Sequence, residues 1–168
     1  TFFDGGREVV PDDGFSRWIN VEPKFGGRYL PENDSYAMQT IAHNTVVVDQ
    51  TTQNEANERR DEAVWPDRHF FETANANVQA MSARADRFYP NVGMQRTMLL
   101  LRDARLPYPV ALDVYRLTSA AEHTYDYPLH FRGQLIATTA GYRANVTRLE
   151  PMGGSHGYQH IWCEATGR

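Results

Sequence analysis

The sequence contains 168 residues with a formal net charge of −4, and 41% of its residues are hydrophobic. This length corresponds to one domain and is sufficient for a hydrophobic core. The mildly acidic balance gives no indication of a nucleic-acid partner. No apolar run approaches the about 18 residues of a membrane span, and no basic segment followed by an apolar one indicates a leader. The single cysteine, Cys163, excludes a disulfide within the chain.

Short strands separated by turns are predicted along the whole chain, and no long helix is indicated. Arg96 and Arg102 bound an apolar run that is typical of a buried strand, and residues 103–109 supply the turn into the next strand. About ten strands at this spacing predict an all-β fold, specifically an antiparallel β-sandwich. The predicted strands cover residues 1–3, 7–10, 45–49, 68–73, 77–84, 94–102, 110–117, 125–131, 134–138, 144–149 and 159–165.

Two polar stretches interrupt the strand pattern. Residues 51–66 are rich in Asn, Glu and Arg and predict a surface loop or a short polar helix. Residues 33–40 predict one helical turn before His43. The sequence begins without a methionine on a strand that enters a Gly-Gly turn, and it ends in a further strand pattern. We therefore expect one β-sandwich domain over residues 1–168 that is truncated at both ends.

Three polar features in the first 50 residues are candidates for a functional site. Asp12 and Asp13 lie in a Pro-Asp-Asp-Gly sequence, which is usually a turn. His43 precedes the apolar residues 46–48, a position where histidine is more often a hydrogen-bonded structural residue than a ligand. Tyr29 follows a Gly-Gly pair that permits a sharp turn, and tyrosine there is usually a surface aromatic. The functional alternative is a polar site on a rigid scaffold.

Two sequence words in this region resemble a known family. Residues 20–33 read N-V-E-P-K-F-G-G-R-Y-L-P-E-N, and residues 39–49 read Q-T-I-A-H-N-T-V-V-V-D. Together they resemble the oligoalginate lyases of polysaccharide lyase family 17, within the heparinase II/III-like superfamily. The second word is common to much of the superfamily, whereas the first is narrower and indicates alginate. The resemblance implies the C-terminal β-sandwich domain of a larger protein that also has an N-terminal α-helical barrel.

The resemblance assigns roles to particular residues of this sequence. It implies that Asp12 and His43 bind a structural zinc ion, with a third ligand from a His-x-His motif upstream of residue 1. Asp13 stands where the family has a tyrosine, so Asp12 and Asp13 both remain candidates for the aspartate ligand. Tyr29 matches the catalytic tyrosine that faces the glycosidic bond. Arg17 matches an arginine that contacts the uronate substrate.

The implied reaction is β-elimination of alginate oligosaccharides, with exo action and release of an unsaturated uronate. A base removes the C5 proton, which lies α to a carboxylate, and an acid protonates the leaving O4, so the carboxylate must first be neutralised. Because the absent barrel carries further active-site residues, this chain alone is expected to be inactive. The expected partner is an anionic oligosaccharide, without nucleic acid or a membrane span, and the expected location is periplasmic or secreted in a bacterium. The sequence leaves open whether the protein forms a homodimer.

Two alternatives remain at this point. One is a lyase acting on a glycosaminoglycan or another uronate polymer, because the His-Asn-Thr-Val word is shared widely. The other is a non-catalytic carbohydrate-binding sandwich in which Trp18, Trp65 and Trp162 serve as stacking platforms. Their simpler interpretation is as core and edge aromatics.

The remaining histidines carry weaker signals. His123 and His130 could form a metal pair, although two polar positions on one sandwich strand are the favoured interpretation. His156 and His160 occupy a glycine-rich turn and the strand predicted after it. A phosphate cradle is disfavoured there because neither a lysine nor a helix pattern follows.

Overall fold

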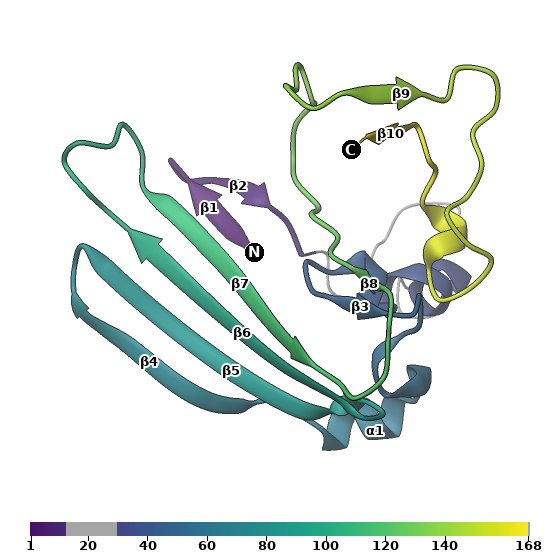
Figure 1. Ribbon diagram of the computed structural model, residues 1–168, viewed down its shortest axis with the longest axis horizontal. Helices are drawn as coiled ribbons and strands as arrows, with labels where there is room; N and C mark the ends of the chain where they lie inside the picture. Colours follow the sequence, from purple (N-terminus) through teal and green to yellow (C-terminus); the bar gives the residue numbers. More distant parts are fainter. Residues whose placement is uncertain (13–29, 168) are drawn as a thin grey trace. The chain divides into compact units, whose positions relative to one another are not determined.

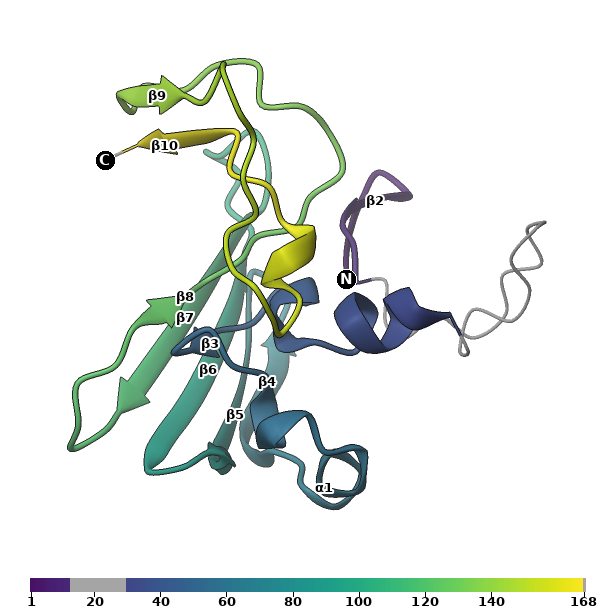
Figure 2. The ribbon, with the colours of Figure 1, turned by 90° about the vertical axis from the view of Figure 1, so that its right-hand side faces the viewer.

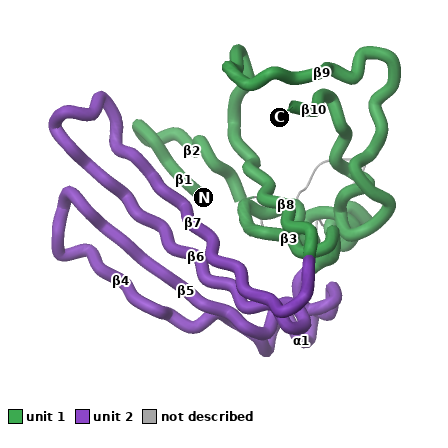
Figure 3. Tube along the Cα trace, in the orientation of Figure 1, with its two compact units in different colours: residues 1–52, 123–168 green, residues 53–122 purple. Residues whose placement is uncertain are grey.

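The computed structural model describes residues 1–12 and 30–167. The chain forms two compact units, which Figure 3 separates by colour. Unit 1 comprises Thr1–Thr52 and His123–Arg168, and unit 2 comprises Gln53–Glu122. No helix in the described ranges combines the length and the apolar character needed to cross a membrane.

The described residues of unit 1 contain pairs of short antiparallel strands (Figure 1). β1 pairs with β2, β3 with β8, and β9 with β10. The β3–β8 pair joins the two sequence halves of the unit, because Val47 lies opposite Asp126 and Val48 opposite Tyr125. The strands are β1 Phe2–Asp4, β2 Arg7–Val10, β3 Val47–Val48, β8 Tyr125–Asp126, β9 Tyr142–Ala144 and β10 Ala165–Gly167.

The core of unit 1 forms where helical turns meet β3. Ile41, Val47 and Tyr158 are buried against one another, and Ile161 packs against them. Burying side chains of this size contributes roughly 1.5–3 kcal/mol each. The helical turns are the π-helical Asn33–Ala37 and the 3₁₀ turns Thr40–Ala42 and Tyr158–His160. The core therefore connects segments more than 100 residues apart in the sequence, Ile41 and Tyr158 among them.

Unit 2 is built on one antiparallel sheet with the strand order β4-β5-β6-β7 (Figures 1 and 2). The Pro90-Asn91 turn joins the two central strands, and Asn91 adopts a positive φ of 58°. Asparagine tolerates this left-handed conformation better than most residues. The elements are the 3₁₀ turn Gln53–Ala56, α1 Glu58–Ala63, β4 Asp67–Asn75, β5 Val78–Tyr89, β6 Val92–Leu101 and β7 Val110–Thr118.

Polar cross-strand contacts add to the backbone ladder of this sheet. The hydroxyls of Ser82 on β5 and Thr97 on β6 are 3.0 Å apart. Arg96 on β6 makes a bidentate ion pair with Asp113 on β7, with distances of 3.0 Å from Nε to Oδ1 and 2.6 Å from Nη2 to Oδ2. The Arg96 guanidinium also lies 5.0 Å from the centroid of the Tyr115 ring. These contacts reinforce the strand register.

The predicted all-β, antiparallel class is confirmed, since the described residues form mainly antiparallel strands with few short helical segments. The predicted core position of residues 46–48 is also confirmed, because Val46, Val47 and Val48 are each at most 3% exposed. Both helical predictions are correct. A helical turn occupies Asn33–Ala37, and α1 lies within the polar stretch 51–66.

Several strand predictions are wrong in whole or in part. Of the predicted strand 144–149 only Ala144 lies on a strand, β9, and the predicted strand 45–49 is reduced to Val47–Val48. Residues 134–138 form no strand, and Leu135 and Ile136 are 74% and 93% exposed, so they have no buried face. The predicted strand 125–131 ends at Asp126, because Pro128 has no N–H to donate and the His130 N–H donates to a side chain instead. The predicted strand 159–165 begins instead as a 3₁₀ turn after Gly157, whose φ of 89° is left-handed.

Gly157 allows a direct test of the unit 1 core. A Cβ at this position would lie 2.5 Å from Ile41 Cγ2 and 3.0 Å from Gln39 Cβ, and the φ of 89° disfavours any L side chain. We expect Gly157→Ala to lower the free energy of unfolding by about 1–3 kcal/mol, measured by denaturant titration of the full-length protein. Gly154→Ala is the matched control, because a Cβ there meets no atom within 4 Å. Equal stability of the two variants would contradict this packing.

Candidate functional site

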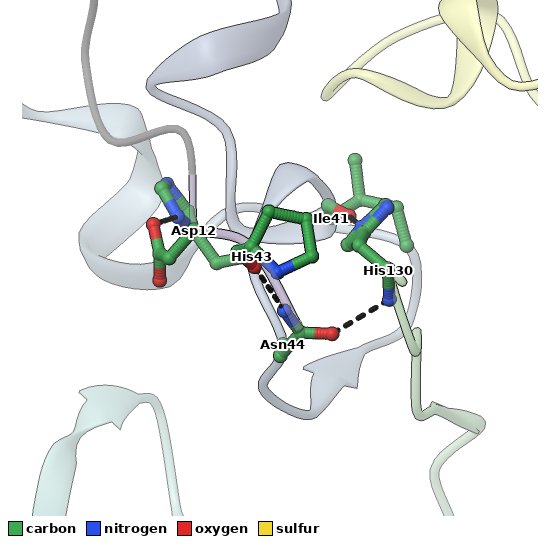
Figure 4. A network of polar contacts seen from close by, with 6 residues as sticks. Asp12, Ile41, His43, Asn44 and His130 are labelled. Carbon is green, nitrogen blue, oxygen red and sulfur yellow. Dashed lines mark hydrogen bonds and ion pairs between the residues drawn. The ribbon is translucent and has the colours of Figure 1, made fainter. Parts of the chain in front are cut away.

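Asp12 and His43 are in direct contact. Asp12 follows the end of β2, and His43 ends the 3₁₀ turn Thr40–Ala42 just before β3. His43 Nδ1 lies 2.9 Å from Asp12 Oδ1 (Figure 4). The two side chains are 28% and 39% exposed, so the pair is accessible from solvent. An imidazole and a carboxylate therefore converge although they are 31 positions apart in the sequence.

A second set of hydrogen bonds holds the segment that carries His43. Asn44 donates through Nδ2 to the Pro11 carbonyl at 2.7 Å, and its Oδ1 accepts from the His130 backbone N–H at 2.6 Å (Figure 4). His130 Nε2 lies 2.8 Å from the Ile41 carbonyl oxygen. Because a carbonyl can only accept, His130 carries its proton on Nε2. Three chain segments, after β2, before β3 and after β8, are thereby tied together.

A further carboxylate–histidine contact fixes the other end of β3. Asp49 Oδ2 lies 2.6 Å from His123 Nδ1, and Asp49 Oδ1 accepts from the Thr124 backbone N–H at 2.8 Å. The His123 hydrogen bond, followed by that from Thr124, holds the pKa of the Asp49 carboxyl below its ordinary value. Both hydrogen bonds favour the ionised form of Asp49. Through them, the Asp49 carboxylate links the end of β3 to the start of β8.

The Tyr158–His160 turn contacts the helical turn that follows Tyr29 in the sequence. His160 Nε2 lies 2.9 Å from Ser35 Oγ, and the His160 and Tyr36 rings meet edge to face with centroids 5.6 Å apart. Gln159 donates through Nε2 to the Ser35 carbonyl at 3.1 Å. Gln159 and His160 thus hold the Asn33–Ala37 turn in place through these contacts.

Comparison with known proteins identifies the family. Residues 1–167 match the family described as Heparinase II/III-like, C-terminal. The chain belongs to this family. It is 43% identical over 166 residues to an alginate lyase of Stenotrophomonas maltophilia and 36% identical over 168 residues to an exo-oligoalginate lyase of Saccharophagus degradans. Each alignment covers 98% of this chain but 22% of the relative, so the chain spans about a fifth of the length of these curated relatives.

These matches confirm the resemblance predicted from the two sequence words. They also show that the heparinase-like similarity extends well beyond those words, across the long strands of unit 2. The pattern of predicted strands in residues 50–102 did not by itself indicate the family. The chain corresponds to a portion of a longer lyase in both relatives.

The donor set of the Asp12–His43 pair fits part of a zinc site. Zinc accepts carboxylate oxygen and imidazole nitrogen, each at about 2.0–2.2 Å. The contacting atoms are 2.9 Å apart, so both can reach a single ion. Among the described residues, no group of three or more His, Cys, Asp or Glu side chains converges on one point. Asp12 and His43 would thus supply two ligands, and a third would come from outside the described part.

The structure does not place several of the predicted site residues. Tyr29, Arg17, Asp13 and Trp18 lie outside the described residues. Their roles therefore stay predictions, as does the choice between Asp12 and Asp13 as the aspartate ligand.

The strand interpretation of His123 and His130 is wrong. β8 covers only Tyr125–Asp126, so neither histidine lies on a strand. His123 Nδ1 contacts Asp49 and His130 Nε2 contacts a backbone carbonyl, which means that both act as hydrogen-bonding residues that join segments.

Sequence reasoning missed two residues that organise the site, Asn44 and Ser35. Asn44 has a recognisable signal, because it directly follows His43 in the His-Asn-Thr-Val word. Ser35 has none, since its partner His160 lies 125 positions away.

The Asp49–His123 contact predicts a pH-dependent contribution to stability. A carboxyl group with a lowered pKa stabilises the fold fully above its ordinary pKa, 3.8, and loses that effect as pH falls through the lowered value. We expect Asp49→Asn to be less stable than wild type at neutral pH, with the difference shrinking below about pH 4. Denaturant titrations of the full-length protein across this range measure the effect. Glu164→Gln, an exposed carboxylate of the same unit, should show no such trend. A pH-independent Asp49→Asn defect would contradict the assignment.

Proposed function

We propose that the protein containing this chain is a polysaccharide lyase that cleaves alginate-type oligouronates by β-elimination. The observation that carries the proposal is the similarity to an alginate lyase and an exo-oligoalginate lyase along 98% of this chain. The contact between Asp12 and His43 supports it, because it brings together the two residues that the family resemblance implicates in metal binding.

The chemistry defines what such a protein must provide. The C5 proton of a uronate lies α to a carboxylate, and the negative charge of the carboxylate makes this proton a very weak acid. Positive charge or hydrogen bonds must first neutralise that carboxylate. A base then removes the proton, and an acid protonates the departing O4.

We assign these roles to residues of the first segment. Arg17 would bind the substrate carboxylate, since a guanidinium presents paired donors to two carboxylate oxygens. Tyr29 would protonate the leaving oxygen, because its phenol is neutral near pH 7 and can donate a proton at short range. Both assignments rest on the sequence resemblance.

Asp12 and His43 would hold the structural zinc. A zinc ion held there would cross-link the chain after β2 to the chain before β3. This cross-link would fix the orientation of the intervening segment, which includes Arg17 and Tyr29. The Asn44 hydrogen bonds to the Pro11 carbonyl and the His130 N–H already hold the same two chain segments. These hydrogen bonds would therefore hold both proposed ligands in position before zinc binds.

We further propose exo action with release of an unsaturated uronate, which the name of the Saccharophagus degradans relative supports. The substrate would be an oligouronate, and a periplasmic or secreted location would give access to it. Whether the protein forms a homodimer stays open.

A carbohydrate-binding role without catalysis is the second candidate. It is favoured by Trp65 and Trp162, which are 65% and 53% exposed and so are not the core aromatics of the simpler interpretation. Exposed indoles can stack on sugar rings. Incubating the full-length protein with alginate, heparan sulfate and polygalacturonate decides between the functions, because β-elimination creates a C4–C5 double bond that absorbs ultraviolet light. Absorbance with alginate oligomers supports the lyase, absorbance with another polymer identifies a related lyase, and none with any of them leaves the binding role.

Tyr29→Phe tests the proposed acid. The substitution removes only the phenolic oxygen, so folding and metal content should be retained. We expect kcat on alginate oligomers to fall by about 10²–10⁴-fold, as for other positioned acid–base groups. Tyr142→Phe is a suitable control, because this tyrosine is 65% exposed on β9. A Tyr29→Phe enzyme with near wild-type kcat would assign the acid role elsewhere.

Metal analysis tests the proposed ligands. We expect about one zinc ion per full-length chain, and a strong reduction in both Asp12→Ala and His43→Ala because each variant loses one of a small number of ligands. His69→Ala is the matched control, since His69 lies on β4 in unit 2. Unchanged zinc content in the Asp12 and His43 variants, or an equal loss in the control, would refute the site.

A further inference from the structure

A polar depression lies on one face of the four-stranded sheet, near the turn that joins β5 and β6. All of its lining residues belong to unit 2, and none belongs to the Asp12–His43 region. The side chains that bear on its chemistry are Arg84, Asp86, Gln95, Arg116 and Thr118, with Gly93 between them.

Strand register places the polar groups of this depression in one row. Arg84 on β5 is opposite Gln95 on β6, and Gln95 is opposite Arg116 on β7. Directly paired residues project from the same face of a sheet. Two strand spacings separate the Arg84 and Arg116 backbones, a span of about 10 Å. The two guanidinium groups therefore flank an amide across three adjacent strands.

Gly93 keeps the depression open. A Cβ there would lie 2.6 Å from Thr118 Oγ1 and 3.1 Å from Asp86 Oδ1. The φ of Gly93 is outside the left-handed region that favours glycine, so the backbone conformation alone does not require this residue. Glycine at this position therefore leaves open the space between the Asp86 and Thr118 side chains, which a Cβ would fill.

The two arginines differ in their surroundings. Arg84 is held by Asp86, with Nη2 3.1 Å from Oδ2 and Nε 3.3 Å from Oδ1. Arg116 is exposed and has no hydrogen-bond or ion-pair partner within the described ranges 1–12 and 30–167. Its guanidinium donors are thus available to an external anion, and a planar carboxylate can accept two of them in parallel.

The other groups suit a hydroxyl-rich ligand. The Asp86 carboxylate retains lone pairs beyond those used by Arg84. The Gln95 amide nitrogen lies 3.2 Å from both His69 Nδ1 and Ser82 Oγ, so the amide oxygen is the group that remains for a ligand. Thr118 Oγ1 donates to the Gly93 carbonyl at 3.4 Å and keeps its lone pairs as acceptors. Acceptors beside a guanidinium disfavour an anion without hydroxyl groups, such as sulfate, because such an anion offers no donors to them. A ligand with both a carboxylate and hydroxyl groups matches the whole set.

We propose that this depression binds a uronate unit of an oligosaccharide, with Arg116 as the receptor for the sugar carboxylate. The proposal rests on the proposed function for the choice of sugar acid. The ligand carboxylate pairs with the Arg116 guanidinium, and the ligand hydroxyls donate hydrogen bonds to the Gln95 amide oxygen, Thr118 Oγ1 and the Asp86 carboxylate. Unit 2 thereby contributes affinity for the same class of anionic sugar that the lyase would cleave.

Calorimetric titration of the full-length protein with alginate oligomers tests this site. Tyr29→Phe is present in every sample to slow turnover. We expect Arg116→Gln to raise Kd by about tenfold or more, since a hydrogen-bonded charge pair is lost, and Arg116→Lys to restore part of the affinity. Gly93→Ala should also weaken binding without changing charge. Arg59→Gln on α1 makes the same charge change away from the depression and should leave Kd unchanged.

Each outcome has a defined meaning. An unchanged Kd in Arg116→Gln, or an equal change in Arg59→Gln, overturns the site. So does a change in Arg116→Gln that appears equally with a methyl-esterified, uncharged oligomer. If Arg116→Gln instead alters the oligomeric state in sedimentation and not Kd, the depression contacts protein and the proposal fails. An Arg116-dependent Kd in a protein that eliminates no polymer leaves this site standing while the lyase function fails.

Discussion

The hydrogen bonds of Asn44 are the constraint on which the candidate site depends. The residues between the 3₁₀ turn and β3 have few partners in a regular strand ladder, so side chains must satisfy the neighbouring backbone groups. Asn44 accepts from the His130 N–H and donates to the Pro11 carbonyl, and these two bonds fix the chain on either side of His43 and Asp12. The imidazole and the carboxylate meet because their backbones are already held in place.

Burial behind this segment supplies the rigidity that the polar contacts need. Val47 and Ile41 are buried with Tyr158, and the absence of a Cβ at Gly157 lets the backbone before Tyr158 lie against Ile41. The same turn brings His160 and Gln159 to Ser35. One buried cluster thus supports both the segment carrying His43 and the helical turn after Tyr29, so a change in the core is expected to affect the site without touching its polar residues.

Part of this arrangement could be predicted from the sequence. The long strands of unit 2 have apolar runs bounded by charge and turn residues, and that local pattern is enough to locate them. The Asp12 and His43 pair was predictable only because the His-Asn-Thr-Val word resembles a family. Pro128 was visible in the sequence as a strand breaker, but local patterns could not show that the His130 N–H donates to the Asn44 side chain, or that residues 134–138 have no face to bury, since these facts depend on contacts distant in sequence.

Anomalous diffraction from crystals of the full-length protein, collected on either side of the zinc absorption edge, tests whether Asp12 and His43 bind zinc together. We expect one anomalous peak within about 2.0–2.2 Å of both an Asp12 carboxylate oxygen and a His43 ring nitrogen. A third ligand from outside the described residues should complete it. A peak elsewhere, or a direct Asp12–His43 hydrogen bond with no peak beside it, would show that these two residues do not bind zinc.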